Sequence, residues 1–271
     1  MKNEPNYLAI LAGLGKLNNP QPATLGALLG TYNRRSELTV VESQKRIKAE
    51  LSKTATGRIT QGRELPDPEQ LGLADGRKLN TAILYNDLHR FTALVSSHPK
   101  EITLLVLDSF VSEMTRITSL CNGTVVDCAG DRIMAAFCKP SGDGSTKPIE
   151  DAVRCAFWMQ TVVSKALNPV LSQRGLPPLS CGIGIEYGEV LVARVGVRNR
   201  NKLVFLGHAA NWAAKLQDLA QDGETILSQT AYKYRPSYMT VANSWFFKFE
   251  PDIFNPYWYR SNCIFAKDQL V

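Results

Sequence analysis

The 271-residue sequence predicts an α+β fold, a mixed β-sheet with a βαββαβ, ferredoxin-like core and helices packed on one of its faces. Three observations support this prediction. From residue 80 onward, short apolar runs typical of strands alternate with longer segments of helical periodicity. Tight turns separate some strands and long helices separate others, which favours a mixed sheet. The composition, 44% hydrophobic and 21% charged, is that of a globular protein.

The chain is predicted to consist of an N-terminal appendage and one larger domain. Apolar residues recur at helical spacing in residues 1–53, which are therefore expected to be helical. Residues 54–78 are rich in Gly, Thr, Pro and charged residues and indicate a linker or loop. We place the helical appendage and linker at residues 1–75 and the larger domain at residues 76–271.

The first half of the larger domain is predicted to contain a strand, a helix and a hairpin. The strand covers residues 80–86. An amphipathic helix follows at residues 100–121, and its apolar face comprises Ile102, Leu105, Val106, Phe110, Met114, Ile117 and Leu120. The apolar runs 123–128 and 131–138 flank an Ala-Gly turn and predict the hairpin.

The second half is predicted to begin with a helix at residues 149–168. This helix should end before Pro169, because the residue preceding a proline disfavours the helical conformation. A second hairpin is expected from residues 180–187 and 189–195, with its turn near Gly188. The remaining predicted elements are a strand at 202–206, a helix at 208–221, and strands near 244–249 and 257–264.

Charge and hydropathy exclude several classes of function. The net charge of +6 suits an anionic ligand such as a nucleotide, but it is too weak and scattered to indicate nucleic-acid binding. No apolar run approaches the roughly 20 residues that span a bilayer. The N-terminus has no signal-peptide pattern, so we expect a cytoplasmic protein without a membrane span.

Two aspartates stand beside apolar runs and are the first candidate site residues. Asp87 ends the predicted strand 80–86, and Asp131 lies in the turn of the first hairpin, so both should lie at neighbouring strand ends. Two carboxylates in one poorly solvated pocket repel each other. A divalent cation resolves this, and aspartate oxygens are ligands that Mg²⁺ prefers. Alternatively, Asp87 is simply the cap of the following helix.

Five segments within residues 81–235 carry motifs in a fixed order. They are Asp87-Leu-His-Arg-Phe-Thr92, Gly130-Asp131 with Met134 and Phe137, Gly182-Ile-Gly-Ile-Glu-Tyr-Gly-Glu189, Leu206-Gly-His-Ala-Ala-Asn-Trp-Ala-Ala-Lys-Leu216, and Gly223-Glu-Thr-Ile-Leu-Ser228. Together they resemble the catalytic domain of class III nucleotide cyclases, the adenylate and guanylate cyclase family. The resemblance implies the class III cyclase fold for the larger domain and does not reach residues 1–75.

The resemblance also implies a role for each matching residue. Asp87 and Asp131, assisted by the Leu88 carbonyl, would hold two Mg²⁺ or Mn²⁺ ions per site. Asn211 would orient the ribose and the transition state. Lys215 stands where the family usually has an arginine, so the positive charge is kept but the bidentate fork is lost. Further implied contacts to the phosphates and ribose are Phe91, Thr92, Arg132 and Arg194.

The family works as a dimer with its active sites at the interface. By resemblance, Asp87 and Asp131 would come from one chain, and Asn211 and Lys215 from the other. All four residues are present here, so a homodimer with two equivalent sites is expected.

Two positions that select the purine in the family depart from the family pattern. The residue three before the Gly of the Gly-Asp pair is Lys in adenylate cyclases and Glu in guanylate cyclases, but here it is Asp127. The residue three before Gly207 is Val204, which cannot form a side-chain hydrogen bond. Neither fits adenine, whereas Asp127, as a shortened Glu, leaves guanine open. Alternatively, Asp127 is a solvated or salt-bridged strand residue and Val204 a core residue.

A third departure is Arg90, which replaces a glycine of the family motif. Arginine fills the space and adds five hydrogen-bond donors, which favours a one-ring base. Arg90 can donate to a uracil carbonyl, and Asp127 can accept from N3–H. A bulky residue here also resembles the pyrimidine cyclases of bacterial Pycsar anti-phage systems, which make cyclic UMP or cyclic CMP for a separate effector. Alternatively, Arg90 points outward or grips a phosphate.

The sequence therefore predicts a uridylate cyclase that converts UTP to 3′,5′-cyclic UMP and pyrophosphate. A cytidylate cyclase remains an alternative, because Asp127 can equally accept from the cytosine amino group. A purine cyclase is a further alternative. So is a non-catalytic homologue that only binds nucleotide or dimerises, which the lysine at position 215 motivates.

Overall fold

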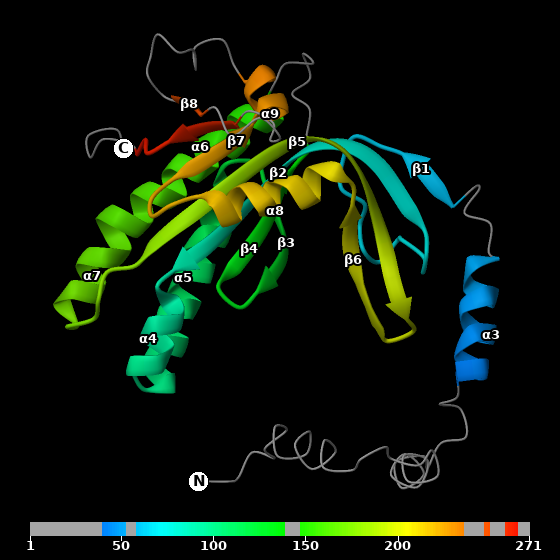
Figure 1. Cartoon of the computed structure of the whole chain (residues 1–271), viewed down its shortest axis with the longest axis horizontal. Helices are drawn as coiled ribbons and strands as arrows, with labels where there is room; N and C mark the ends of the chain where they lie inside the picture. The colour runs from blue at the N-terminus through cyan, green and yellow to red at the C-terminus, as the bar shows by residue number, and fades with distance from the viewer. Residues whose placement is uncertain (1–39, 53–57, 139–146, 236–246, 250–257, 265–271) are drawn as a thin grey trace, which may run out of the picture. The chain divides into compact units, whose positions relative to one another are not determined.

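The computed structural model describes residues 40–52, 58–138, 147–235, 247–249 and 258–264. The chain divides into two compact units, Met1–Thr54 and Ala55–Val271. In the first unit, the described residues form helix α3, Val40–Leu51, which confirms the helical prediction there (Figure 1). The predicted helical residues before position 40 lie outside the described part of the chain. No described helix has the length and apolar character needed to cross a membrane.

One mixed β-sheet forms the centre of the second unit, as predicted (Figure 1). Its strands run in the order β3-β4-β2-β5-β7-β9-β8, with β1 beside β2 and β6 beside β5. The pairs β2–β4 and β2–β5 are antiparallel, and β5–β7 is parallel. The strands are β1 Ile59–Gln61, β2 Gly76–His89, β3 Thr124–Ala129, β4 Arg132–Phe137, β5 Ser180–Val197, β6 Arg200–Leu206, β7 Thr225–Ser228, β8 Phe247–Phe249 and β9 Trp258–Ser261.

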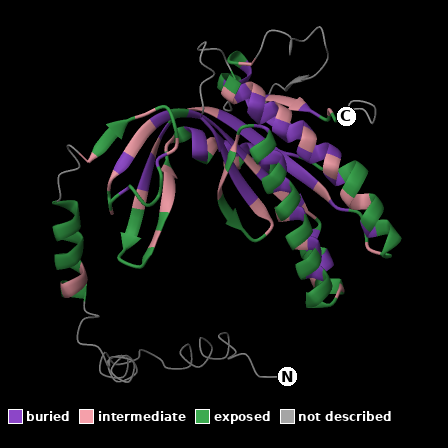
Figure 2. Ribbon diagram, turned by 180° about the vertical axis from the view of Figure 1, so that it is seen from behind, coloured by how far each residue is buried: buried purple, intermediate pink, exposed green. Residues whose placement is uncertain are grey.

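Helices cover both faces of the sheet, so the prediction of helices on one face only is wrong. Successive residues of a strand face opposite sides. On β2, Leu84 packs in the layer with α5 and α6, whereas Ile83 packs with α8. The central strands are buried along most of their length (Figure 2). The helices are α4 Phe91–Ser97, α5 Lys100–Leu120, α6 Lys147–Val162, the π-helix η1 Val163–Leu167, α7 Asn168–Gln173, α8 His208–Leu219 and α9 Gln229–Lys233.

The first predicted hairpin is confirmed, but the second is wrong. Strands β3 and β4 flank a turn at Gly130, as predicted. The expected turn at Gly188 does not exist, because β5 runs through it as one strand of 18 residues. A tight hairpin turn favours a pair such as Asn-Gly or Asp-Gly, and Gly188 has no such residue before it. The chain turns instead between β5 and β6, where Asn199 adopts a positive φ of 68°.

The predicted helix end before Pro169 is also wrong. The helical path continues from α6 through the π-helix η1 into α7, which has the proline in its first turn. In η1, the Asn168 N–H donates to the Val163 carbonyl five residues earlier. This wider turn changes the hydrogen-bond register just before the proline. The N–H that a proline lacks is not needed at the start of a helical segment, so the helix tolerates it there.

The face predicted for residues 100–121 is only partly buried. Val106, Phe110 and Met114 are buried in the core, whereas Ile102 and Leu105 are exposed. Ile102 and Leu105 line an apolar cavity of about 480 Å³ between α5 and the η1–α7 segment. This cavity lies in the α5–α6 layer, on the opposite side of the sheet from α8.

Candidate active site

The two predicted metal ligands lie side by side at one edge of the sheet. Asp87 in β2 is the Cα partner of Arg132, the first residue of β4. Asp131 directly precedes Arg132 in the β3–β4 turn, where Gly130 takes a φ of 65°. Burial raises the pKa of the Asp131 carboxyl above its ordinary value, and the charge of Asp87 raises it further. The structure therefore brings together the two carboxylates that the sequence predicted to meet.

This pair fits a hard divalent cation. The described residues contain no cluster of three or more acidic, His or Cys side chains that could enclose a metal ion. Mg²⁺ does not require such a cage, because it commonly binds one or two carboxylates and completes its shell with waters and substrate phosphates. The mutual repulsion of Asp87 and Asp131 is what a bound cation would relieve. The Leu88 side chain is buried, so its predicted contribution rests on its carbonyl alone.

Asn211 and Lys215 lie one turn apart on the exposed side of α8. The Lys215 Nζ atom lies 5.3 Å from the centre of the Trp212 ring. Helix α8 packs closely on β5, because Gly184 has no side chain to separate the strand from the backbone of Ala213 and Gln217. The two predicted catalytic side chains are thus presented outward from a firmly seated helix.

Arg132 connects the carboxylate edge to α8. Its Nε atom is 3.7 Å from Asp87 Oδ1, and its Nη2 atom donates to Asp218 Oδ1 at 3.0 Å. Asp218 lies one turn beyond Lys215 on the same helix. The sequence did not single out Asp218, although its spacing of seven residues from Asn211 places both on one helical face.

Two of the three predicted base-selecting residues, Asp127 and Val204, lie on β3 and β6. Asp127 lies at a bulge of β3, and its Oδ2 is 3.4 Å from Lys202 Nζ. Val204 is two residues from Lys202 on β6 and therefore faces the same side of the strand. In the single chain, Asp127 is thus the salt-bridged strand residue of the alternative interpretation. Tyr85 lies nearby. Burial raises the pKa of its hydroxyl, and the charge of Asp127 raises this pKa further.

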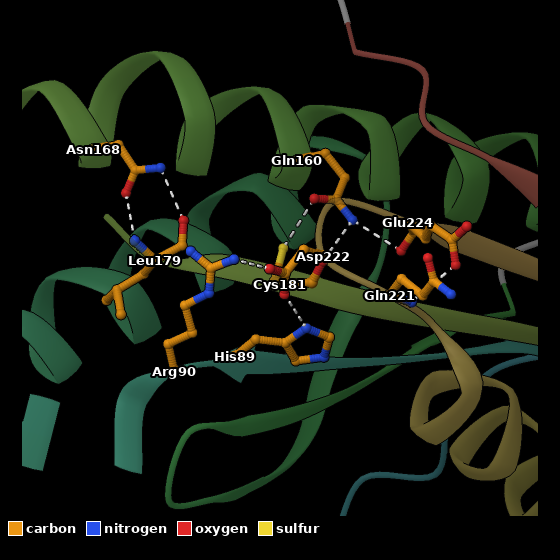
Figure 3. Close-up of polar contacts among 9 residues, drawn as sticks. All are labelled: His89, Arg90, Gln160, Asn168, Leu179, Cys181, Gln221, Asp222 and Glu224. Carbon is orange, nitrogen blue, oxygen red and sulfur yellow. Dashed lines mark hydrogen bonds and ion pairs between the residues drawn. The ribbon is translucent and has the colours of Figure 1, made fainter. Parts of the chain in front are cut away.

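Arg90 pairs with a residue of another loop. It follows β2 with φ 68° and ψ 2°, and its guanidinium pairs with Asp222, to which His89 Nδ1 also donates at 2.9 Å (Figure 3). Asp222 belongs to the loop between α8 and β7. Tyr85, which is level with Asp127 in the sheet, is five residues before Arg90, or about 16 Å along an extended strand. One chain therefore does not bring Arg90 and Asp127 together.

Among the remaining predicted substrate contacts, Phe91 and Thr92 lie at the start of α4, and Arg194 has other partners. Phe91 is buried in the core at the start of α4, and Thr92 is exposed beside it. Arg194 Nε donates to Asn201 Oδ1 at 2.6 Å, and its Nη1 donates to the carbonyls of Pro68 and Leu71 at 3.2 and 3.0 Å. Arg194 therefore braces the loop before β2 in this structure.

Comparisons with known proteins agree with this arrangement. Residues 74–245, more than half of the chain, match the model of the adenylate and guanylate cyclase catalytic domain. A uridylate cyclase of Rhodovulum sp. (strain MB263) is 28% identical over 180 residues, which cover 63% of this chain and 72% of that protein. A uridylate cyclase of Burkholderia cepacia is 30% identical over 181 residues, which cover 64% and 76%.

Solved structures show the same fold. The crystal structure of the guanylyl cyclase Cya2 superimposes with a TM-score of 0.61 at 24% identity, covering 71% of this chain and 96% of that one. At this identity the likeness establishes the fold alone. The matched family model spans both aspartates and α8, and the chain belongs to the family of adenylate and guanylate cyclase catalytic domains.

Proposed function

We propose that this protein is a uridylate cyclase, which converts UTP to 3′,5′-cyclic UMP and pyrophosphate. The observation that carries the cyclase chemistry is the pair Asp87 and Asp131, held together by the pairing of β2 with β4. The preference for UTP is supported by the two relatives named uridylate cyclases and by the departures at the base-selecting positions. We assign the catalytic domain to residues 76–271 and the appendage with its linker to residues 1–75, of which Ile59–Gln61 pairs with β2 in the sheet of the second unit.

In the reaction, the ribose 3′-oxygen attacks the α-phosphorus, the bond from that phosphorus to the bridging oxygen breaks, and the 3′-hydroxyl proton is lost. Mg²⁺ or Mn²⁺, two per site, would acidify the attacking hydroxyl and neutralise the phosphates. Asp87, Asp131 and the Leu88 carbonyl would bind these ions. Asn211 orients the ribose, and Lys215 places a positive charge against the charge that develops on the phosphate.

The complete site requires two chains. Arg90 and Asp127 are too far apart within one chain to contact the same base, so a joint role requires Asp127 from the partner. The same division applies to the aspartate pair of one chain and the outward-facing Asn211 and Lys215 of the other. Exposed apolar side chains on the β5–β6 pair, Val195, Val197 and Leu206, provide surface for such a homodimer.

In this arrangement, the base is read by a donor and an acceptor. Uracil presents two carbonyl acceptors on either side of N3–H. Arg90 donates to one carbonyl, Asp127 accepts from N3–H, and Val204 offers no group that would satisfy an adenine. When the site buries such polar groups, a mismatched base leaves them unpaired, which can discriminate by about 10⁴-fold. Both residues would first exchange their present partners, Asp222 and Lys202, for the base.

A product assay tests the proposal. Purified protein is incubated separately with ATP, GTP, CTP and UTP in the presence of Mn²⁺, and the products are identified by mass spectrometry. Cyclic UMP from UTP alone is expected. Cyclic AMP or cyclic GMP as the main product would contradict the assignment of the base pocket. No product from any nucleotide would contradict the cyclase assignment. Asp131→Ala should retain the fold, as judged by circular dichroism, and lose all turnover.

Cytidylate cyclase activity is the second candidate. Asp127 Oδ1 accepts from the Cys128 N–H, and Oδ2 pairs with Lys202. Once Lys202 is displaced, Asp127 can accept from the amino group of cytosine as readily as from N3–H of uracil. Cyclic CMP as the main product of the same assay would select this candidate. For either product, we propose a role as a second messenger in anti-phage defence, sensed by a separate effector protein.

A further inference from the structure

Arg132 lies between two carboxylates that belong to different elements. Its Nε atom is 3.7 Å from Asp87 Oδ1, and its Nη2 atom is 3.0 Å from Asp218 Oδ1. Arg132 and Asp87 are Cα partners in neighbouring strands, so the register of the sheet holds the two side chains on one face. Asp218 reaches the guanidinium from α8. The contact is therefore built by β2, β4 and α8 together.

The Arg132 guanidinium lies beside Asp87, at the place where a metal ion would bind. A cation bound to Asp87 would stand within a few ångströms of Arg132, and two like charges so close repel each other. A metal ion must therefore displace the guanidinium from Asp87 or bind against its field. Without a metal ion, Arg132 neutralises a carboxylate that would otherwise face Asp131 uncompensated.

Asp218 makes this displacement easy. Arg132 already donates to Asp218, so the guanidinium keeps an ionic partner after it leaves Asp87. The side chain of Arg132 is 39% exposed, so solvent borders it on one side. A guanidinium released in this way stays beside the carboxylates, where the phosphates of a bound nucleotide would lie, and it can bind phosphate oxygens in a bidentate manner.

We infer that Arg132 is an exchangeable counter-ion of Asp87. In the empty site, it neutralises Asp87. When metal ion and nucleoside triphosphate bind, it leaves Asp87 and contacts the phosphates while Asp218 keeps it within reach. The consequence is that metal ion alone binds weakly and binds well only together with the triphosphate. This inference rests on the proposed function, because it takes Asp87 as a metal ligand.

The test is a titration of the full-length, nucleotide-free protein with Mn²⁺, in which free Mn²⁺ is followed by electron paramagnetic resonance. Arg132→Gln should bind Mn²⁺ about 3- to 10-fold more tightly than the wild type, because the competing cation is gone. The matched control is Arg116→Gln, which removes the same charge from the exposed side of α5. Its affinity for Mn²⁺ should equal that of the wild type.

Asp218 distinguishes a contact from a general effect of charge. Asp218→Asn should weaken Mn²⁺ binding about 2- to 5-fold, because Arg132 then has Asp87 as its remaining partner. In the Arg132→Gln background, the same Asp218→Asn substitution should have no effect if Asp218 acts through Arg132. The titrations are repeated in about 0.5 M KCl, where long-range fields are screened but direct contacts persist.

A second measurement follows the nucleotide. In saturating Mn²⁺, 3′-deoxy-UTP cannot cyclise, and its binding is measured by calorimetry. Arg132→Gln should bind it about 10-fold more weakly than the wild type, because a charged contact to the phosphates is lost. The inference therefore predicts two opposite effects of Arg132→Gln. Compared with the wild type, the variant binds metal ion alone more tightly and binds the triphosphate more weakly.

Three results would overturn the inference. The first is an unchanged or weaker Mn²⁺ affinity in Arg132→Gln. The second is an effect of Asp218→Asn that persists without Arg132. The third is unaltered binding of 3′-deoxy-UTP by Arg132→Gln. Failure of the proposed function is recognised separately with Asp87→Asn. If that variant binds Mn²⁺ as the wild type does, Asp87 is not a metal ligand, and the proposed function fails together with the inference.

Discussion

Arg90 adopts a backbone conformation that ordinarily favours glycine. Its φ of 68° costs a residue with a side chain about 1 kcal/mol or more relative to glycine. The ion pair with Asp222 offsets part of this strain, although exposed pairs contribute only about 0–1 kcal/mol. The backbone therefore gives a simple reason for the glycine of the family motif at this position. The arginine therefore stands here against the conformational preference of its backbone.

Arg90→Gly should loosen the choice of base. The substitution relieves the left-handed strain and removes the donor proposed for a uracil carbonyl, so the preference for UTP over ATP should fall by about 10-fold or more. The products from all four nucleoside triphosphates check this by mass spectrometry. Asp222→Asn is the control, because it releases the arginine without removing it. Unchanged selectivity in Arg90→Gly would exclude Arg90 from base recognition.

Glu186 is a second residue whose environment has a measurable consequence. It lies on β5 with 2% of its surface exposed, accepts hydrogen bonds from the Ser228 hydroxyl and the Tyr187 N–H, and has a pKa that burial raises above the ordinary value. The folded protein therefore binds this proton more readily than the unfolded chain. Stability should fall as the pH rises from the ordinary pKa of a glutamate through the raised one.

Glu186→Gln should remove this loss of stability, because the amide carries no charge at any pH. The melting temperature of the variant relative to the wild type should increase by about 2–4 °C between pH 4 and pH 7.5. Calorimetry or circular dichroism at the two pH values measures the difference. A difference that is the same at both pH values would mean that the Glu186 charge does not affect stability.

At the scale of elements, the seat of α8 on β5 depends on Gly184. A methyl group there would overlap with the Ala213 carbonyl oxygen and the Gln217 amide nitrogen, which are backbone atoms and cannot rotate away. Gly184→Ala should therefore lower the free energy of unfolding by about 1–3 kcal/mol and displace α8. Because α8 carries Asn211 and Lys215, turnover should fall as well.

Urea unfolding measures the loss of stability, and the matched control lies on the same strand. A methyl group at Gly188 would meet only the Ala209 Cβ atom, at an ordinary distance of 3.5 Å. Gly188→Ala should change stability by about 0.5 kcal/mol or less. Equal effects at both positions would show that the close contact under α8 is not what matters.

The elements that the sequence predicted correctly have clear local signals. Helix α5 has a long apolar period, and the β3–β4 hairpin has a glycine with positive φ between two apolar runs. The continuous strand β5 and the π-helix were not predicted, because their conformations depend on contacts with other parts of the chain. Gly188 is extended because β2 pairs with it, and Pro169 is tolerated because the preceding turn widens.

The same division applies to the candidate site. Asp87 and Asp131 were predictable as neighbours because two strands and a tight turn determine their positions. The ion pairs of Arg132 with Asp218 and of Arg90 with Asp222 join residues 86 and 132 positions apart. No local pattern indicates such pairs. The separation of Arg90 from Asp127 likewise emerges only from the register of the sheet.

At the scale of the whole molecule, the proposed homodimer predicts complementation between two inactive variants. Asp131→Ala lacks a metal ligand and Asn211→Ala lacks the ribose contact, so each homodimer should be inactive. In a mixed dimer, one site combines an intact aspartate pair with an intact Asn211. If subunits exchange freely, half of the dimers are mixed and each has one working site, which restores about one quarter of the wild-type activity.

The measurement is cyclic nucleotide production after the two variants are unfolded and refolded together in equal amounts. Refolding each variant alone provides the baseline, and a tagged subunit confirms that exchange has occurred. If mixed dimers form and no activity returns, the site does not take its residues from two chains.

The π-helix and the proline that follows it determine which deletions this helix tolerates. A π-turn arises when one extra residue is inserted into an α-helix without lengthening its ends. Removing that residue from Val163–Leu167 would restore the regular ladder, and the nitrogen of Pro169 would then fall where a hydrogen-bond donor is required. The deletion alone would therefore harm the helix, whereas the deletion together with a replacement of Pro169 would not. A one-residue deletion within Val163–Leu167 should therefore be tolerated only when Pro169 is replaced as well.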